Sequence, residues 1–570
     1  MKTSFLSTFS HRRWLLFVGL SLAGSPGYAQ GDWQSVANLG GNISDVRATT
    51  TDEAGNVYLA GAFSGTVTLG SQTLTSVGGT DVFLAKWNTS GFVWAQRAGG
   101  VGDDAATAVA THSGSVYVGG TFAGATAAFG STTLTNAGTA PTTDIFVARY
   151  TDAGSAANLN WAQQAGGTAN DELNAVAATA ADVYAVGSFV GSARFGNAFL
   201  TSSVSTSPDI FITKLTTTGS AGGFVWTQSA GGPGPDAATA VGVSGANVYV
   251  AGSFSNTGSF GTNLVFSAGN QDLFVTRLTD AGSTSSFAWV QRAGGANDDL
   301  ATCLAVRGSG VYVAGSFASI AANFTGVILA NNGNADLFVA KLNDIGTTAP
   351  VFSWAQRAGG TGFEQATALA LNGSSLYVAG QFNSPLVGFG TAAALSNSQS
   401  GFFDILVAKI NDLGPSNNFT WAQQAGSPQH DYAKGLAVSG ARVYMVGSVT
   451  LPARFGSQQL SGTAGTTTSF LATLLDTNVI TAQAEAAELA GLSLYPNPAH
   501  HRVMLQLPAG SGAAATATLL DATGRIVRSS LVTPTANGVV EVPLTGLRAG
   551  LYYVQVQLGK LRAARPLVVE

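Results

Sequence analysis

The chain has 570 residues, of which 45% are hydrophobic and only 10% are charged, and its formal net charge is −5. This balance excludes an intrinsically disordered chain, which combines few apolar residues with many charges. The 73 glycines follow no three-residue period, which excludes collagen, and the single cysteine, Cys303, excludes an internal disulfide.

The first element along the chain is a signal peptide, which we expect over residues 1–29. Arg12 and Arg13 lie in a basic start, and an apolar run over 14–24 is followed by small residues up to Ala29. The run is shorter than the ~20 residues that cross a bilayer, and no other stretch reaches that length. We therefore expect an exported protein with no transmembrane segment after cleavage. An uncleaved N-terminal anchor is the alternative.

Residues 30–476 repeat one pattern seven times. Each repeat opens on a tryptophan, and successive tryptophans are 61 to 67 residues apart: Trp33, Trp94, Trp161, Trp226, Trp289, Trp354 and Trp421. Four short apolar segments in each repeat, bounded by Gly, Asn, Asp and Ser, have the length and composition of strands. In the fourth repeat these segments are 238–243, 247–252, 272–277 and 287–291. No segment within 33–476 has the periodicity of a capped helix.

Four antiparallel strands in each of seven units predict an all-β protein with a seven-bladed β-propeller over 30–476. The last repeat ends with segment 469–474, whereas the tryptophan strand at 32–36 has no strands before it. We expect this N-terminal strand to complete the last blade and close the ring, which would remove open sheet edges. A seven-coil β-helix is the structural alternative.

The repeat also resembles a known one. Its order of Trp-x-x-x-Ala-Gly-Gly, Val-Tyr-Val-Ala-Gly and Asp-x-Phe-Val-Ala-Lys is similar to a bacterial β-propeller repeat that occurs in tandem sets. The resemblance implies the fold and no single shared activity. Segment 116–120, Val-Tyr-Val-Gly-Gly, is similar to the kelch pattern, but the other six repeats lack its glycine pair, so kelch is the weaker match.

One acidic residue lies between the tryptophan strand and the next strand of every repeat. The set is Asp45, Asp104, Asp171, Asp236, Asp299, Glu364 and Asp431. These are the candidate ligand-binding residues, because a ring of carboxylates near the mouth of a channel would attract a cation. We favour the alternative, in which each carboxylate closes a turn by accepting local backbone N–H groups, and we assign no metal or cofactor.

Four further sets recur at fixed positions, and two of them are charged. An aspartate precedes the third strand and a cation follows five residues later, but the last repeat has Ser469 and Leu474 instead. The aspartates are Asp81, Asp144, Asp209, Asp272, Asp336 and Asp404, and the cations are Lys86, Arg149, Lys214, Arg277, Lys341 and Lys409. Their joint absence from the last repeat suggests one ion-pair network between strands or blades.

The repeated aromatic residues are expected to fill the space between blades, with sugar binding as the alternative. The tyrosines are Tyr58, Tyr117, Tyr184, Tyr249, Tyr312, Tyr377 and Tyr444. A glycine follows each of them three residues later, from Gly61 to Gly447, and we expect it to let neighbouring sheets approach closely.

The connections from fourth to first strand and from second to third strand emerge on one side, here called the long-loop face. We expect recognition there, because varied loops on a rigid frame are where binding residues usually lie. The histidines after residue 30 share no repeat position, and no catalytic, metal or nucleotide motif occurs, so no catalytic residue is assigned. Cys303 is expected to be a small buried hydrophobic residue.

An Ala- and Glu-rich linker is expected at 477–491, followed by a small β-sandwich at 492–570. Three motifs lie there: Leu-Tyr-Pro-Asn-Pro at 494–498, Leu-Asp-Ala-Thr-Gly-Arg at 520–525 and Leu-Arg-Ala-Gly-Leu-Tyr-Tyr at 547–553. They resemble the type A sorting domain of the type IX secretion system of Bacteroidota. The resemblance assigns the sorting motif to Pro496, Asn497, Pro498, Asp521, Gly524, Arg525, Gly550 and Tyr552. An adhesion-type sandwich is the alternative.

The sorting-domain resemblance implies the type IX secretion machinery as a partner and a secreted or cell-surface location. With it, the sequence predicts an exported, monomeric β-propeller that binds an extracellular ligand, namely a glycan, a protein or an envelope component. The central repeats are acidic, which disfavours nucleic acid as a partner. Two alternatives stay open: a secreted enzyme that acts on polysaccharide on the long-loop face, and a purely structural surface protein.

Overall fold

The computed structural model describes residues 31–217, 222–346, 349–397, 399, 401–414, 417–476, 493–507, 515–521, 526–532, 535, 538–558 and 561–570. All regular elements in these ranges are strands, and no helix occurs among them. The all-β prediction is therefore confirmed. The expected signal peptide at 1–29 and the expected linker at 477–491 lie outside the described residues.

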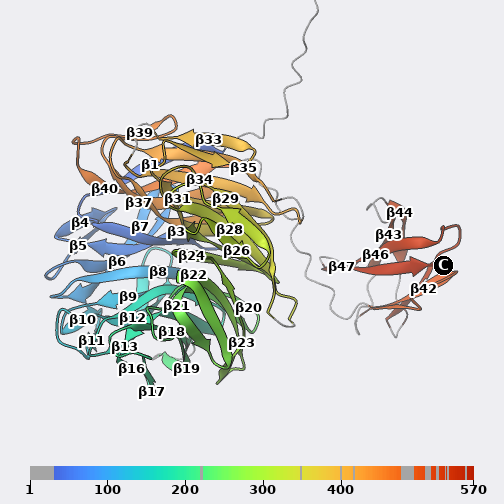
Figure 1. The fold of residues 1–570 in the computed structure, drawn as a ribbon, viewed down its shortest axis with the longest axis horizontal. Helices are drawn as coiled ribbons and strands as arrows, with labels where there is room; N and C mark the ends of the chain where they lie inside the picture. Colours follow the sequence, from blue (N-terminus) through green and yellow to red (C-terminus); the bar gives the residue numbers. More distant parts are fainter. Residues whose placement is uncertain are drawn as a thin grey trace, which may run out of the picture.

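In the described part of the repeat region, seven units, which we number 1 to 7, each contain four antiparallel strands (Figure 1). Three of these sheets also include a hairpin and so have six strands. The first strands are β2 (Asp45–Thr51), β8 (Asp104–His112), β14 (Asp171–Ala178), β20 (Ala237–Ser244), β24 (Asp299–Arg307), β30 (Glu364–Asn372) and β36 (Tyr432–Ser439). The second strands are β3 (Val57–Phe63), β9 (Ser115–Phe122), β15 (Asp182–Val190), β21 (Asn247–Phe260), β25 (Gly310–Phe317), β31 (Ser375–Phe382) and β37 (Arg442–Thr450).

The outer half of each sheet consists of a third and a fourth strand. The third strands are β6 (Asp81–Asn88), β12 (Asp144–Asp152), β18 (Pro208–Thr216), β22 (Asn263–Asp280), β28 (Asp336–Asn343), β34 (Asp404–Asn411) and β40 (Thr467–Leu475). The fourth strands are β7 (Gly91–Gly100), β13 (Ala157–Gly167), β19 (Gly223–Ala230), β23 (Ser285–Ala293), β29 (Phe352–Ala358), β35 (Phe419–Gly426) and, in unit 7, β1 (Asp32–Gly40).

Strand β1 joins the two ends of the repeat region. It pairs antiparallel with β40, with Trp33 opposite Leu474, which is where the tryptophan pattern places it. The first strands of successive units also contact one another in order, from β2 and β8 through to β30 and β36, and β36 contacts β2.

A short hairpin interrupts most second-to-third connections. These hairpins are β4–β5 (Thr66–Leu69, Gln72–Thr75), β10–β11 (Thr126–Phe129, Thr132–Thr135), β16–β17 (Ser192–Phe195, Ala198–Thr201), β26–β27 (Ala321–Phe324, Val327–Ala330), β32–β33 (Leu386–Phe389, Ala392–Ser396) and β38–β39 (Ala453–Phe455, Gln458–Leu460). In units 2, 3 and 7 the hairpin pairs with the fourth strand of the preceding unit, as β38 does with β35. The hairpins therefore tie neighbouring sheets together on the long-loop face.

The middle strands are buried on both faces because neighbouring sheets cover them. Strand β3, Val-Tyr-Leu-Ala-Gly-Ala-Phe, is buried throughout, and so is β34. Tyr58 and Trp94 of unit 1 pack in one cluster with Val118 and Phe146 of unit 2. This placement agrees with the expectation that the repeated aromatic residues fill the space between units.

The glycine that follows each tyrosine has a different reason from the one expected. A Cβ on Gly61 would lie 2.0 Å from the carbonyl oxygen of Asp45, and one on Gly252 would lie 2.0 Å from that of Ala237. Both carbonyls belong to the first strand of the same sheet, beside a β-bulge. The close approach is thus within each sheet, and the expectation of an approach between sheets was wrong.

The C-terminal region forms two sheets that share one core. One contains β41 (Ser493–Tyr495), β42 (Arg502–Gln506) and β45 (Val539–Pro543), and the other contains β44 (Ile526–Val532), β43 (Ala515–Asp521), β46 (Gly550–Leu558) and β47 (Leu561–Val569). Val503, Leu519, Val542 and Val554 are buried together between them. The alternation of apolar and polar residues along these strands directs one side of each sheet into this core.

Candidate functional site

Six of the seven predicted acidic residues close turns on the long-loop face. Asp104 Oδ2 accepts the N–H of Gly100 at 2.6 Å, and its Oδ1 accepts the N–H of Ala123 at 3.2 Å. The same two-sided contact recurs at Asp171, Asp236, Asp299, Glu364 and Asp431. All six are buried. Within the described ranges, no group of three or more His, Cys, Asp or Glu side chains is arranged to hold a metal ion.

Burial disfavours the ionised form of these carboxyl groups. It raises the pKa of Asp104 and Asp431 to about 6 and that of Asp171 and Asp236 to about 7, although the backbone N–H groups oppose the shift.

The seventh member, Asp45, does not occupy the same position. Asp104 pairs with Phe122, whereas Asp45 pairs with Ala62, one residue before the equivalent Phe63. Its carboxylate is partly exposed and accepts from Arg47 Nε at 2.8 Å. Asp45 therefore lies one residue after the position of the buried acids, which Ser44 occupies in unit 1, so the alignment of the repeats was wrong at this residue.

A second carboxylate lies beside each of the six buried ones. A Cβ on Gly99 would lie 2.7 Å from both Asp81 Oδ1 and Asp104 Oδ2, so the two side chains face the same glycine. At the junction of units 4 and 5 a single N–H, that of Gly295, reaches Asp272 Oδ1 at 3.1 Å and Asp299 Oδ2 at 2.7 Å. The long-loop face therefore carries pairs of buried acids rather than a single ring.

The aspartates before the third strand and the cations after it do not form one network, so that expectation was wrong. Asp81 pairs with Arg97 on the fourth strand of its own sheet at 2.5 Å. Lys86 pairs at 2.6 Å with Asp152, which belongs to the next unit. Residues five apart on a strand point to opposite faces, so the two side chains reach different neighbours. In unit 7 Leu474 replaces the cation, and the register puts Thr89 of unit 1 at the place where Asp344 of unit 5 lies.

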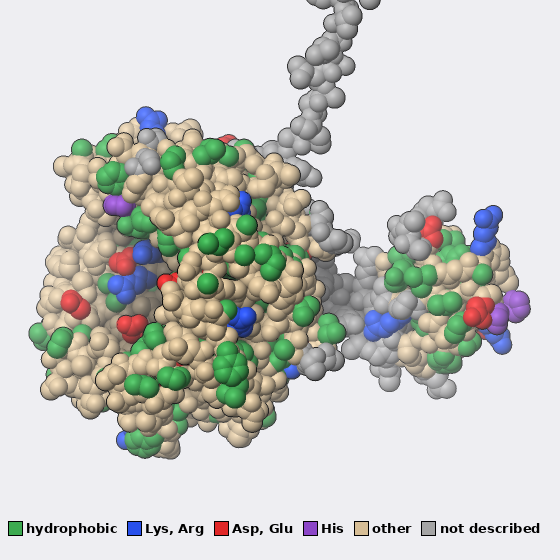
Figure 2. All heavy atoms as spheres, viewed as in Figure 1, with side chains coloured by type: hydrophobic (Ala, Val, Ile, Leu, Met, Phe, Trp, Pro, Cys, Tyr) green, Lys and Arg blue, Asp and Glu red, His purple; other side chains and the backbone are tan. Residues whose placement is uncertain are grey.

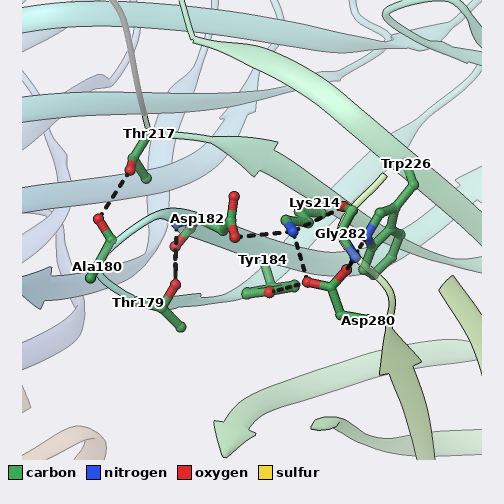
Figure 3. Close-up of polar contacts among 9 residues, drawn as sticks. All are labelled: Thr179, Ala180, Asp182, Tyr184, Lys214, Thr217, Trp226, Asp280 and Gly282. Atoms are coloured by element: carbon green, nitrogen blue, oxygen red, sulfur yellow. Dashed lines mark hydrogen bonds and ion pairs between the residues drawn. The ribbon is translucent and has the colours of Figure 1, made fainter. Parts of the chain in front are cut away.

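Sequence analysis missed the acids that receive these cations (Figure 3). Asp280 accepts from Tyr184 Oη at 2.6 Å, Lys214 Nζ at 2.7 Å and Trp226 Nε1 at 3.1 Å, all from the preceding unit. Burial disfavours its ionisation, but these hydrogen bonds outweigh burial and hold the pKa of Asp280 below its usual value. The equivalent acids are Asp152, Asp344, Asp412 and Asp476. Four of the five stand two residues before a glycine, a signal that comparison of the turns could have found.

The long-loop face has a cavity at the junction of units 6 and 7. Its volume is about 540 Å³, and its lining includes Asp404, Gln424, Ser427, Arg454 and Gln459. Asp404 is only 5% exposed. Burial and the neighbouring Asp431 raise the pKa of Asp404 to about 7. A second cavity of about 260 Å³ lies between units 1 and 2 at the first-to-second-strand turns, with Asp52 and His112 in its lining.

Aromatic side chains gather beside Asp404 and Asp431. His430 stacks on Tyr432 at 6.1 Å between ring centroids, and Phe402 and Phe403 lie 5.0 and 5.6 Å from the His430 ring. Phe363 contacts Phe403 edge-on at 5.9 Å. We call Phe363, Phe402, Phe403, His430 and Tyr432 the aromatic cluster. His430 is exposed and the other four are half-buried, so the cluster presents ring surface to solvent.

The backbone explains how the aromatic cluster is held. In units 2, 3 and 5 an Asp or Asn just before the buried acid accepts an N–H from the residue before the third strand, as Asp103 does from Thr80 at 2.9 Å. His430 takes this role in unit 7 through Nδ1, which accepts the N–H of Phe403 at 3.2 Å. Lys434 Nζ lies 5.5 Å from the centre of the Tyr432 ring.

Figure 2 shows that charged side chains on the viewed side gather in a hollow, while the surface around it is largely uncharged.

Of the predicted sorting-motif residues that the structure describes, Asp521, Gly550 and Tyr552 lie in strands of the C-terminal sheets, and Pro496, Asn497 and Pro498 lie in the bend after β41. Asn497 Oδ1 accepts the N–H of Val568 at 2.8 Å, and Tyr552 Oη donates to the carbonyl of Arg548 at 3.0 Å. Asp521 pairs with Tyr552 across β43 and β46. Pro496, Pro498 and Gly550 lie in the same region, and Gly524 and Arg525 lie outside the described residues.

Comparison with known families identifies this region. Residues 493–570 match the family model "Secretion system C-terminal sorting domain". The chain thus carries a type IX sorting domain, and it is a secreted or cell-surface protein. Within the described residues, no helix is both long and apolar enough to cross a membrane.

Two individual proteins are similar to the chain. "Regulatory protein FlaEY" of Caulobacter vibrioides is 28% identical over 458 residues, which cover 75% of this chain and 45% of that protein. The chain thus spans less than half the length of this relative. Among solved structures, the "Phage phi92 endosialidase" aligns with 96% of this chain and 90% of its own, with a TM-score of 0.36 and 9% identity.

Proposed function

We propose that the chain is a binding module delivered to the cell exterior, a closed seven-bladed β-propeller over residues 30–476. Support for closure comes from the pairing of β1 with β40 and from the contact between β36 and β2. Each unit then meets two neighbours, and the outer fourth strands are the sheet edges that remain, of which β7, β13 and β35 pair with a hairpin of the next unit.

The ligand site that we propose is the aromatic cluster on the long-loop face. The observation that carries this proposal is its departure from the repeat: the residue before the buried acid is Asp, Asn, Pro and Asp in units 2 to 5, but Phe363 and His430 in units 6 and 7. His430 keeps the backbone hydrogen bond of this position, but its ring and that of Phe363 add solvent-facing aromatic surface that the fold of the other units does not need. Exposed aromatic rings stack on sugar faces, peptide groups and planar cations, at low entropic cost.

A screen of the full chain against immobilised glycans and peptides tests this function, with binding and product release recorded together. We expect saturable binding without product. The double variant Phe403→Ala/Tyr432→Ser should weaken it at least tenfold, since its stacking surface is lost. The matched control Phe199→Ala removes an exposed ring on β17, away from the cluster, and should bind like the parent chain. Product release, or equal loss in both variants, would contradict the proposal.

A further inference from the structure

Asp404 differs from the five aspartates at the equivalent position. Three of those five receive an arginine from the fourth strand of their own sheet: Arg97 reaches Asp81 at 2.5 Å, Arg292 reaches Asp272 at 2.6 Å and Arg357 reaches Asp336 at 2.9 Å. The register puts Gln424 at this place in unit 6, because Gln424 pairs with Leu406 as Arg357 pairs with Phe338. Unit 6 therefore has the acid without its guanidinium.

The other two units without an arginine satisfy their acid in another way. Asp144 accepts the N–H of Ala137 at 2.8 Å, and Asp209 accepts from both the N–H and the hydroxyl of Ser203 at 2.8 Å. Asp404 has no such donor and no cation partner among the described residues. It is 95% buried by the protein, yet it lines the cavity at the junction of units 6 and 7. A carboxylate in this setting is costly unless a donor or cation pairs with it.

We propose that this cavity receives the guanidinium of an arginine side chain from a partner protein, which takes the place that Arg97, Arg292 and Arg357 fill within their own sheets. The proposal deepens the binding function above and rests on the long-loop face being the ligand face. Gln424, Gln459 and Ser427 offer oxygen acceptors for the guanidinium N–H groups that Asp404 leaves unpaired. Arg454 also lines the cavity and is exposed, so an acidic group beside the partner's arginine would complement it.

Isothermal titration of the full chain with N-acetyl-argininamide tests the inference, and N-acetyl-citrullinamide is the matched neutral probe. We expect the arginine compound to bind one site and the citrulline compound to bind at least tenfold more weakly, because a urea carries no charge. N-acetyl-lysinamide should fall between them, since an ammonium lacks the paired N–H fork. Equal binding of arginine and citrulline compounds, or no binding of either, would overturn the inference.

Three variants locate the site. Asp404→Asn should lose at least tenfold in affinity. Gln424→Arg should supply the guanidinium from within the sheet, abolish binding and raise the unfolding midpoint, which a misfolded variant would not do. Arg357→Gln opens the equivalent place in unit 5 and should not weaken binding at Asp404. Retention of binding in Gln424→Arg would refute the site. Loss of binding only in the aromatic-cluster variant would support the proposed function and refute this inference.

Discussion

Replacing Asp280 tests the ion-pair network between units. Asp280→Asn removes the charge that faces Lys214 and weakens the bonds from Tyr184 and Trp226. Breaking a buried ion pair by removing one partner costs about 3–5 kcal/mol. Lys214 keeps a second acid, Asp182 at 3.0 Å, whose side chain is 20% exposed. We therefore expect a loss near the lower end of that range, about 3 kcal/mol.

A double-mutant cycle separates the pair from general disruption of the interface. Lys214→Met should be destabilising alone, because it leaves Asp280 buried without its cation. The double variant should lose about 2 kcal/mol less than the sum of the two single losses, since neither charge is then left unpaired. The measurement is urea unfolding of the full chain, followed by tryptophan fluorescence.

Unit 2 supplies the matched control for this cycle. Arg149 occupies the position of Lys214, but its Nη1 donates to the carbonyl of Thr217 at 2.5 Å, and its Nε and Nη2 donate to Ser115 Oγ at 3.3 and 3.1 Å, with no acid among its described partners. Arg149→Met should cost only about 1–2 kcal/mol, the value of hydrogen bonds to two neutral acceptors. If Asp280→Asn costs no more than this control, or if the two losses in unit 4 simply add, the network does not stabilise the interface.

Two further predictions concern the buried acids and the repeated glycines. Asp171 and Asp236 have pKa values raised from 3.8 to about 7, so the folded state binds more protons than the unfolded state between about pH 4 and 7. The stability that these two groups contribute should therefore fall as the pH rises through this window and level off above it. Urea unfolding midpoints at pH 4.5, 6 and 8 measure this effect. A midpoint that rises across the window contradicts the prediction. Gly252→Ala should lower the free energy of unfolding by more than ~2 kcal/mol, because its Cβ would meet a backbone carbonyl at 2.0 Å. Gly245→Ala, at φ +60° with no atom within 4 Å, should lose only about 1 kcal/mol, and similar losses for both would exclude the clash.

Local patterns were enough to predict the strands of the repeat region and the three sorting motifs. The expected segment 247–252 lies within β21, and the expected segment 287–291 lies within β23. The second-to-third hairpins were not predicted, because strands of three to five residues such as β38 and β39 leave no periodic signal.

The candidate site could be predicted only in part. Comparison of the repeats identified six buried acids, but it took Asp45 as the seventh because Ser44, which occupies that position in unit 1, has no carboxylate to align. The partner of Lys214 is 66 residues away in the next unit, so neither local spacing nor periodicity connects it to Asp280. The aromatic cluster was missed because comparison of the repeats detects residues that recur, whereas Phe363 and His430 differ from the residues that the other units carry at the same position.

The pairing of β1 with β40 sets an order of events during folding. Six sheets are built from strands that follow one another in the chain, so each can form as soon as its own segment is available. The seventh needs Trp33 and Leu474 together, which lie at opposite ends of the repeat region. Because contacts between distant residues form slowly, β1 must wait as a free strand until the last unit arrives. A folding chain therefore has six sheets that can form early and a seventh that forms only when the last unit is available.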